Sequence, residues 1–390
     1  MMTPEERIYS AMSGHVPDRV PVVPKIWVDL AARMTGTPLT EVLTNPLTAL
    51  RVIVEAGVTC HVDGVRQFHF PKRRIIEKEG KVLEVDEKGR CLGDVDMLGG
   101  LMTYLDNARD FHFQDPYTMA HYQYWSSKEP FIRSLEDVAQ ITVPESTFYE
   151  EIGCGQRQKE VMQRSGDDLA MLGDCGSATL AFCVSMRGMH QALLDLIEQP
   201  MLVHRVMEKG FAIAVEKGKF NIDLGLKMLR LNDSVGNMSV ISPHHWRAFV
   251  FPHMKDVCTE LHRYCPDVKI YSHICGNILP IAEDLVEVGL DCIGPLDPLG
   301  GFAPSEIRQR VGDSVALMGG VDTLSFINST PDEIVEEARK CIHQAGRKGG
   351  YILGSGCVVP RGAKRENVEA LRTASEEYGI YRNGRLSVKD

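Results

Sequence analysis

The chain has 390 residues and a formal net charge of -10, with 44% hydrophobic and 25% charged residues. This composition is typical of a globular protein with a large core, and no apolar run is long enough to span a bilayer. The negative charge argues against nucleic-acid binding, because phosphate binding needs a basic surface. The eleven cysteines lack the spacing of a disulfide framework, which indicates a reducing cytoplasm. We therefore expect a cytoplasmic protein that acts on small molecules or on another protein, with no nucleic acid and no membrane as a partner.

The N-terminal stretch MMTPEERIYSAMSGHVPDR is polar and lacks the apolar core of a secretory signal. It instead predicts the start of a helix. Thr3 is placed to cap this helix, Pro4 lies in its first turn, and Glu6 completes a capping box. A second capping box runs from Thr330 to Glu333. Both boxes predict where a helix begins.

Eight apolar strands alternate with helices along the chain. The strands are predicted at residues 20–27, 62–68, 169–174, 227–232, 268–273, 291–296, 314–321 and 351–355. The main helices are predicted at residues 46–56, 191–217, 243–264, 278–288, 304–311, 331–345 and 365–378. Near-continuous apolar strands crossed by helices imply a parallel sheet, and eight of them favour a closed barrel. The predicted fold is therefore α/β, a (β/α)₈ TIM barrel, with a doubly wound open sheet as the alternative.

One segment departs from this alternation. Residues 74–85 alternate like a single hairpin strand and residues 86–89 supply a turn, while the whole stretch 71–131 is rich in aromatic residues. No composition break marks a linker between domains. We expect one domain over residues 1–390, with 71–131 as an insertion that caps or narrows a pocket.

Two strand ends carry groups that bind metals. His273 and Cys275 lie two residues apart at the end of the fifth strand, so their side chains point to the same face. Cys357 follows the eighth strand. In a barrel the carboxyl ends of all strands surround one mouth, so these three side chains would make a zinc site with an open fourth position, the catalytic kind.

The residues by themselves also allow a plainer interpretation. Lone cysteines in strands are usually small buried apolar residues, and a lone histidine is usually part of a core. The long separation of Cys275 from Cys357 is not specific for a metal site. The other cysteines are assigned to the core, with Cys175 and Cys292 noted because they also lie near strand ends.

Aspartates follow four of the strands: Asp174, Asp233, Asp297 and Asp322. Each is a candidate acid, base or fourth metal ligand, or an N-cap of the next helix. We keep Asp233, in RLNDSVG, and Asp322, in GGVDT, as candidate catalytic residues.

Four stretches between Ile241 and Leu371 resemble the uroporphyrinogen decarboxylase superfamily, whose members are (β/α)₈ barrels. The stretches are ISPHHWRAFVFPHMKDV, HICGNILPIAEDLVEVGLDCI, ALMGGVDTLSFINSTPDEIVEEARKCI and GGYILGSGCVVPRGAKRENVEAL. True decarboxylases of this superfamily carry an R-Q-A-G-R-Y motif after the first strand, where this chain reads KIWVDLAARMTG. The resemblance therefore does not imply porphyrinogen decarboxylation.

The chain is more similar to the zinc-dependent, corrinoid-linked methyltransferases of that superfamily, which include methylcobalamin:coenzyme M methyltransferases. Their H-x-C motif and later cysteine match His273, Cys275 and Cys357. The resemblance implies that these three residues bind Zn²⁺. The corrinoid motif D-x-H-x-x-G is absent, and the nearest likeness, residues 110–112, lacks the glycine. We therefore expect the corrinoid (cobalamin) to be carried by a partner protein.

The resemblance implies a methyltransferase that moves a methyl group between a small molecule and the cobalt of a corrinoid protein. The aromatic-rich insertion favours a methoxylated aromatic donor, and hence O-demethylation. The alternatives are a methylcobalamin:thiol methyltransferase, a metal-free lyase of the decarboxylase type, and an inactive barrel that binds a corrinoid protein. Asp233 or Asp322 would act as acid, base or positioning group.

Overall fold

The central sheet has seven parallel strands in a computed structural model that describes residues 1–98 and 100–387. Their order is β1-β7-β8-β9-β10-β11-β12. The bounds are β1 Gly64–Arg66, β7 Ala170–Ser177, β8 Met228–Asn232, β9 Lys269–His273, β10 Cys292–Leu296, β11 Ala316–Val321 and β12 Tyr351–Ser355. Each lies where the sequence predicts a strand.

An irregular segment at residues 20–25 takes the place of the eighth strand, between β12 and β1. Leu353 of β12 accepts a backbone hydrogen bond from Val23 and donates one to Pro21, each 2.8 Å long. On the other side, the backbone N–H of Asp63, just before β1, donates to the carbonyl of Val22 at 2.8 Å. The prolines of this segment have no N–H, so it cannot form a regular strand. The sheet therefore closes, which confirms the predicted (β/α)₈ barrel and excludes the open sheet.

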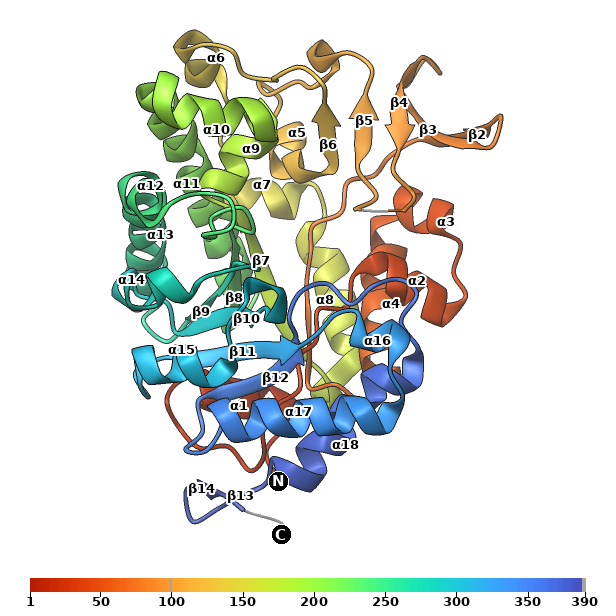
Figure 1. Cartoon of the computed structure of the whole chain (residues 1–390). Coiled ribbons are helices and arrows are strands. Elements are labelled where there is room, and N and C mark those ends of the chain that lie inside the picture. The colour runs from red at the N-terminus through yellow and green to blue at the C-terminus, as the bar shows by residue number, and fades with distance from the viewer. Residues whose placement is uncertain (99, 388–390) are drawn as a thin grey trace.

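Helices surround the barrel, with α13, α15 and α17 on its outer side (Figure 1). The bounds are α1 Pro4–Met12, α2 Val28–Thr35, α3 Leu39–Thr44, α4 Pro46–Thr59, α5 Pro116–Ala120, α6 Leu135–Gln140, α7 Ser146–Glu151, α8 Cys154–Ser165, α9 Leu180–Arg187, α10 Met189–Glu198, α11 Pro200–Asp223, α12 Pro243–His245, α13 Phe251–Tyr264, α14 Ala282–Glu287, α15 Pro304–Val311, α16 Ser325–Asn328, α17 Pro331–Ala345 and α18 Arg365–Tyr378. Within the described ranges, no helix combines the length and the apolar character needed to cross a membrane.

Three predicted helices, α15, α17 and α18, begin and end where the sequence indicates. The predicted helix at 191–217 is instead two helices, because Gln199 precedes Pro200 and is forced out of the helical conformation, with φ -138° and ψ 54°. The predicted helix at 243–264 contains a π-helical turn at Trp246–Val250. Both predicted capping boxes are present, at α1 and at α17.

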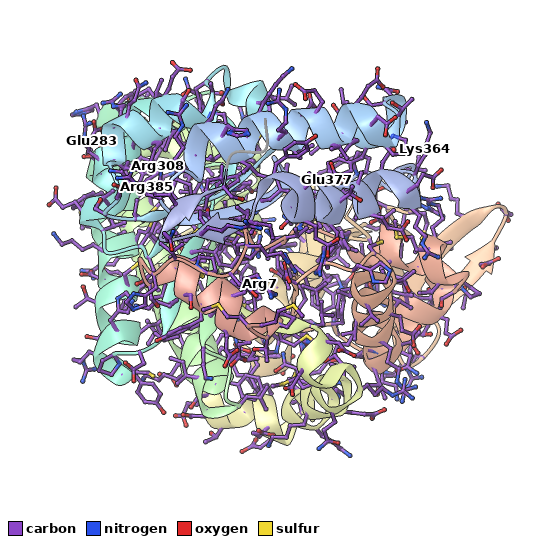
Figure 2. The ribbon with its side chains drawn as sticks, turned by 90° about the horizontal axis from the view of Figure 1, so that it is seen from below. Arg7, Glu283, Arg308, Lys364, Glu377 and Arg385 are labelled. Atoms are coloured by element: carbon purple, nitrogen blue, oxygen red, sulfur yellow. The ribbon has the colours of Figure 1, made fainter. Side chains whose placement is uncertain are left out.

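Helix α1 closes the N-terminal end of the barrel. Ile8, Ala11 and Met12 are buried and pack in one cluster with barrel residues such as Leu172 and Met228. Figure 2, which views the molecule from below, shows α1, with Arg7 labelled, lying at this end. The barrel interior is therefore closed by apolar packing at this end.

The insertion between β1 and β7 contains a second sheet, in the order β2-β3-β4-β5-β6. Its strands are β2 Ile75–Lys78, β3 Lys81–Val85, β4 Cys91–Val95, β5 Thr103–Leu105 and β6 Trp125–Ser127. Figure 1 shows this sheet at the top of the molecule, away from the two termini. The prediction of one strand over residues 74–85 is wrong. The chain reverses at Glu79 and Gly80, both with positive φ, so β2 and β3 form a hairpin.

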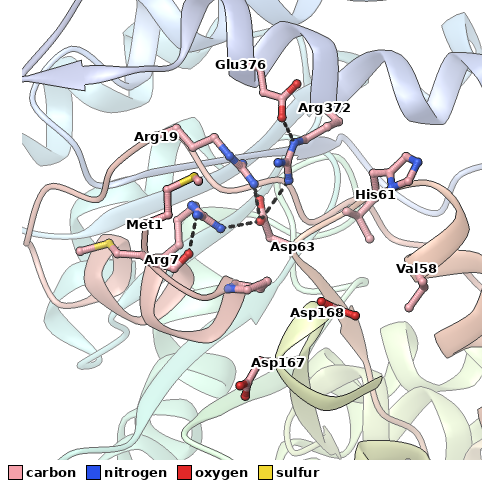
Figure 3. A pocket seen from close by; sticks show the side chains of 13 residues that line it. Met1, Arg7, Arg19, Val58, His61, Asp63, Asp167, Asp168, Arg372 and Glu376 are labelled. Carbon is pink, nitrogen blue, oxygen red and sulfur yellow. Dashed lines mark hydrogen bonds and ion pairs between the residues drawn. The ribbon is translucent and has the colours of Figure 1, made fainter. Parts of the chain in front are cut away.

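The fully buried carboxylate of Asp63 joins α1 to the closing segment. Arg7 donates from Nη1 to Asp63 Oδ1 at 2.8 Å, and Arg19 donates to both carboxylate oxygens at 2.6 and 2.7 Å. The backbone N–H of Val22 donates to Oδ2 at 2.7 Å. Figure 3 shows these groups along one wall of a pocket of about 690 Å³. The Asp63 carboxylate thus pairs with two buried guanidinium groups, one of which, Arg7, also pairs with Asp18, and it connects the helix to the barrel.

We expect Asp63→Ala to lower the free energy of unfolding by about 3–5 kcal/mol, because it leaves buried charges without a partner. Urea denaturation followed by circular dichroism measures this change. As a control, Asp94→Ala removes an exposed ion pair with Lys81 (side chains 65% and 49% exposed) and should cost less than about 1 kcal/mol. A loss below 1 kcal/mol for Asp63→Ala would contradict the structural role of this network.

Candidate metal centre

The structure brings His273, Cys275 and Cys357 together at the carboxyl ends of the strands. His273 ends β9, Cys275 follows it by two residues, and Cys357 follows β12 by two residues. One ligand atom from each lies within 4.8 Å of the others. Cys357 Sγ is 3.9 Å from His273 Nε2. Among residues 1–98 and 100–387, this is the one cluster of three or more such side chains close enough to share an ion.

The turns that carry the two cysteines are held by neighbouring strand ends. Gly276 has φ +90°, which favours glycine, and its N–H donates to Asp297 Oδ2 at 2.9 Å. Ser355 donates from Oγ to the carbonyl of Cys357 at 2.6 Å and accepts the backbone N–H of Lys25 at 3.0 Å. These bonds fix the backbone on both sides of the ligand cluster.

Burial and positive charge keep His273 neutral. Its ring is 1% exposed, and burial lowers its pKa well below the usual value, with the nearby charge of Lys25 adding to the effect. Lys25 Nζ lies 3.1 Å from His273 Nε2. Burial, and after it the charge of Arg230, lowers the pKa of Lys25 to about 7. The neutral imidazole is the form that binds metals.

The two thiols share a proton. The pKa of Cys357 is lowered to about 6, first by a hydrogen bond with Cys275, against burial, and also by the charge of Lys25. The same hydrogen bond, together with burial, raises the pKa of Cys275. These shifts belong to the pair, which loses its first proton near neutral pH and retains the second. A thiolate and a neutral imidazole are the forms of cysteine and histidine that bind metals, so less deprotonation is needed when an ion binds.

The cluster fits a zinc ion. A nitrogen and a sulfur bound to a tetrahedral zinc at 2.0–2.1 Å and 2.3 Å would lie roughly 3.6 Å apart. The observed separation of His273 Nε2 and Cys357 Sγ is 3.9 Å. One imidazole and two thiols are also the donor set that zinc prefers over magnesium or calcium. Because Lys25 faces the same Nε2 atom, its amine must turn aside when an ion binds.

The carboxylates of the two candidate catalytic aspartates are engaged in hydrogen bonds of the turns that follow their strands. The carboxylate of Asp233 accepts hydrogen bonds from Thr179 Oγ1 and from the N–H of Ala181, at the start of α9. Burial raises the pKa of Asp233 to about 6, against these hydrogen bonds. Asp322 accepts the N–H of Leu324 at 2.8 Å within its own turn. Both carboxylates hold turns that follow barrel strands, and a catalytic role for either stays a prediction.

Three basic residues that act on the cluster were not predicted from the sequence. Lys25, Arg66 and Arg230 are 9%, 3% and 4% exposed, and their positive charges all act on His273. Each lies within a largely apolar stretch that the sequence predicts to be a strand, at residues 20–27, 62–68 and 227–232. That pattern is a usable signal, because charged residues are seldom fully buried without a purpose.

The aromatic residues of the insertion pack mainly against one another. Phe111 and Phe131 stack with ring centroids 4.0 Å apart, and Phe111 lies 6.4 Å from Trp125. Phe111 and Phe131 are buried. These rings form a core of the inserted segment, and the role of residues 71–131 as a cap stays a prediction.

Comparison with known proteins identifies relatives of two kinds. The sequence model of the family described as "Uroporphyrinogen decarboxylase (URO-D)" matches residues 119–378. A methylated-thiol–coenzyme M methyltransferase of Methanosarcina mazei is 28% identical over 184 residues, 47% of this chain and 47% of that protein. A uroporphyrinogen decarboxylase of Thermosynechococcus vestitus is 29% identical over 254 residues, 62% of this chain and 70% of that protein. The methylcobamide:CoM methyltransferase MtaA of Methanosarcina barkeri is 24% identical over 229 residues, 56% of this chain and 62% of that protein.

The solved structure of a methyltransferase from Methanosarcina mazei has the same fold. It superposes with a TM-score of 0.67 and 16% identity, covering 97% of this chain and 99% of that one. By sequence, the match spans about half the length of the methylated-thiol relative. The barrel is therefore shared over its whole length, while sequence likeness is restricted to part of it.

We expect Cys357 to be the first cysteine alkylated by iodoacetamide in metal-free protein at pH 7, because its pKa is about 6 whereas an ordinary thiol has a pKa of about 8.5. Peptide mass spectrometry after EDTA treatment identifies the labelled residue. Labelling of Cys357 should fall as the pH drops below 6, where its thiolate is protonated.

Zn²⁺ added before the reagent should protect Cys357 and leave the exposed Cys91 reactive. Equal labelling of Cys357 with and without Zn²⁺ would show that the cluster does not bind the ion.

Proposed function

We propose that this chain, which belongs to the uroporphyrinogen decarboxylase (URO-D) family, is a zinc-dependent methyltransferase that works with a corrinoid protein. The observation that carries the proposal is the convergence of His273, Cys275 and Cys357 at the open end of the barrel. Three protein ligands leave a fourth position for a substrate, which is the arrangement of catalytic zinc sites. Both cysteines are partly exposed, so a ligand can reach them from the barrel mouth.

Zinc held by these residues would act as a Lewis acid toward a thiol or an ether oxygen, favouring the thiolate or the departing alkoxide or phenoxide. The chain's own contribution is to hold the ligands in their binding forms. Burial keeps His273 neutral, and the hydrogen bond from Cys275 favours the thiolate of Cys357. The turns fixed by Asp297 and Ser355 hold the two thiols in place.

A separate corrinoid protein is the proposed partner. Two relatives carry names that describe methyl transfer to coenzyme M, one of them from a methylcobamide. This chain lacks the D-x-H-x-x-G motif that would hold a corrinoid itself. The cobalt would then have to be presented by another molecule at the barrel mouth, where the strand ends lie.

A thiol is the favoured methyl acceptor, because the names of two relatives describe methyl transfer to coenzyme M, which is a thiol. A methoxylated aromatic donor is the second candidate, and the observation that favours it is Trp27. This side chain follows Lys25 by two residues, is half-buried, and packs edge-on against Phe68 with ring centroids 4.6 Å apart. Its Nε1–H has no hydrogen-bond partner among the described residues. An indole edge of this kind suits a flat, oxygen-bearing ligand.

We expect the purified protein to hold about one zinc per chain, the content of a single catalytic site. Cys275→Ala and Cys357→Ala should each weaken zinc binding more than ~100-fold, because each removes a ligand itself. Inductively coupled plasma mass spectrometry after dialysis against a weak chelator measures the loss. Cys258→Ala, which removes a buried thiol from α13, is the matched control and should keep its zinc.

Methyl transfer should be detected as the change in the corrinoid absorption spectrum when the protein is mixed with a corrinoid protein and a small substrate. Methylated corrinoid with a thiol tests the first candidate, and reduced corrinoid with a methoxylated aromatic tests the second. A chelator should abolish either reaction. Porphyrinogen decarboxylation that survives chelation would contradict the proposal and support a metal-free lyase. Binding of a corrinoid protein without any turnover would contradict it and support an inactive barrel that binds this partner.

A further inference from the structure

Two histidines on the outer side of the barrel are spaced like the nitrogen ligands of one metal ion. His204 lies on α11 and His253 on α13, and these two helices pack against each other. Figure 1 shows both helices, together with α12, on one side of the molecule. His204 Nδ1 is 3.3 Å from His253 Nε2. Neither residue belongs to the ligand cluster of His273, Cys275 and Cys357, so the pair is a separate feature.

The separation of the two nitrogens fits a bound ion. Two imidazole nitrogens bound to one tetrahedral zinc at 2.0–2.1 Å would lie roughly 3.3–3.4 Å apart. The observed separation of His204 Nδ1 and His253 Nε2 is 3.3 Å. Without an ion, two neutral rings at this distance share one hydrogen bond, in which one nitrogen donates and the other accepts. An ion that replaces the proton between them would be bound by both rings.

Packing holds the two rings in place. Phe249 is buried and stacks on His204, with ring centroids 4.8 Å apart and ring planes at 23°. Phe249 lies in the π-helical turn Trp246–Val250, which directly precedes α13. In the first turn of α13, His253 has its ring centroid 5.5 Å from that of His204. π-helical turns are rare and are frequent at functional sites. Because the rings are already oriented, less conformational entropy is lost when an ion binds.

Burial and negative charge make the surroundings of His253 suitable for a metal ion. Burial, and after it the charge of His204, lowers the pKa of His253, so that its ring is neutral at pH 7. The neutral imidazole is the form that binds metals. The negative charges of Asp256 and Glu208 act on the same ring in the opposite direction. Both carboxylates are therefore near enough to attract a cation.

These carboxylates can supply further ligands. Within the described ranges, no third ligand atom lies close enough to both nitrogens to complete a group of three. Glu208 follows His204 by four residues on the same face of α11, and Asp256 follows His253 by three on α13. Glu208 pairs with Arg205, with side chains 48% and 54% exposed. Such an exposed ion pair is weak, so Glu208 can turn toward an ion at little cost.

We propose that His204 and His253 bind a divalent transition-metal ion, with water, Glu208 or Asp256 in the remaining positions. Imidazole suits Zn²⁺, Cu²⁺ and Ni²⁺, whereas Mg²⁺ and Ca²⁺ need oxygen ligands. Two imidazoles hold the ion more weakly than the three ligands of the cluster do. The bound ion links α11 to α13 on the outside of the barrel. This site does not depend on the proposed function.

Zinc titration of a variant without the cluster thiols isolates the second site. In untagged Cys275→Ala, Cys357→Ala protein, isothermal titration calorimetry with ZnCl₂ should detect one ion per chain. Adding His204→Gln or His253→Gln should weaken this binding more than ~10-fold, because each change removes a ligand. MgCl₂ in place of ZnCl₂ should give no binding.

His245→Gln is the matched control in the same background. It removes a neighbouring histidine whose Nδ1 already lies 3.1 Å from Ser242 Oγ, and it should leave zinc binding unchanged. A second readout is thermal. ZnCl₂ should raise the melting temperature of the double cysteine variant and not that of the same variant with His253→Gln, because an ion that binds only the folded protein stabilises it.

The outcomes separate this site from the proposed function. Wild-type protein should take up two zinc ions at saturation and keep one after dialysis against a weak chelator. A second ion on the histidine pair without methyl transfer supports the site and removes the function, whereas methyl transfer with a single ion does the reverse.

Two results overturn the site. One is a double cysteine variant that binds no zinc, with wild-type uptake ending at one ion per chain, since the two rings are then joined by a hydrogen bond alone. The other is zinc that stays bound when His204→Gln and His253→Gln are combined, which locates the ion elsewhere. If a histidine variant does not fold, the zinc content of the wild-type protein and of the double cysteine variant decides the question.

Discussion

Closure of the sheet between β12 and the segment at residues 20–25 is the constraint on which the site depends. His273 and Cys357 belong to strands separated by β10 and β11, and they meet because the strands surround a common axis. The closing segment also carries Lys25, whose backbone is held by Ser355 and whose amine reaches His273. The ligand cluster is therefore assembled by the way the first strand is joined to the last.

Buried arginines are paired with carboxylates at one end of the barrel and less completely at the other. At the N-terminal end, Asp63 and Asp18 pair with Arg7 and Arg19, so the charges stabilise the junction of α1 with the barrel. At the C-terminal end, no carboxylate of the described residues pairs with Arg66, and its Nη1 has no hydrogen-bond partner there. A buried charge left without a partner costs stability.

The insertion shows that a high content of aromatic residues does not by itself predict a binding function. A high density of aromatic residues predicts an apolar surface, but it does not reveal which way the rings face. In the structure Phe111 stacks on Phe131, and both are buried within the inserted segment. Trp27, which lies outside the insertion, is the half-buried ring that follows Lys25 in the closing segment. Which way each ring faces was thus decided by packing and not by the number of rings.

The sequence by itself determined the positions of seven barrel strands, the limits of α15, α17 and α18, and the shared face of His273 and Cys275. These features follow from rules that act over a few residues, namely side-chain periodicity, proline at a helix start and capping. Only the tertiary structure decided that Cys357 lies 3.9 Å from His273 and that Arg66 is buried with its Nη1 unpartnered among the described residues. It also turned the carboxylate of Asp233 toward α9. Such contacts depend on which strands become neighbours when the barrel closes, and no local pattern in the chain encodes that distance.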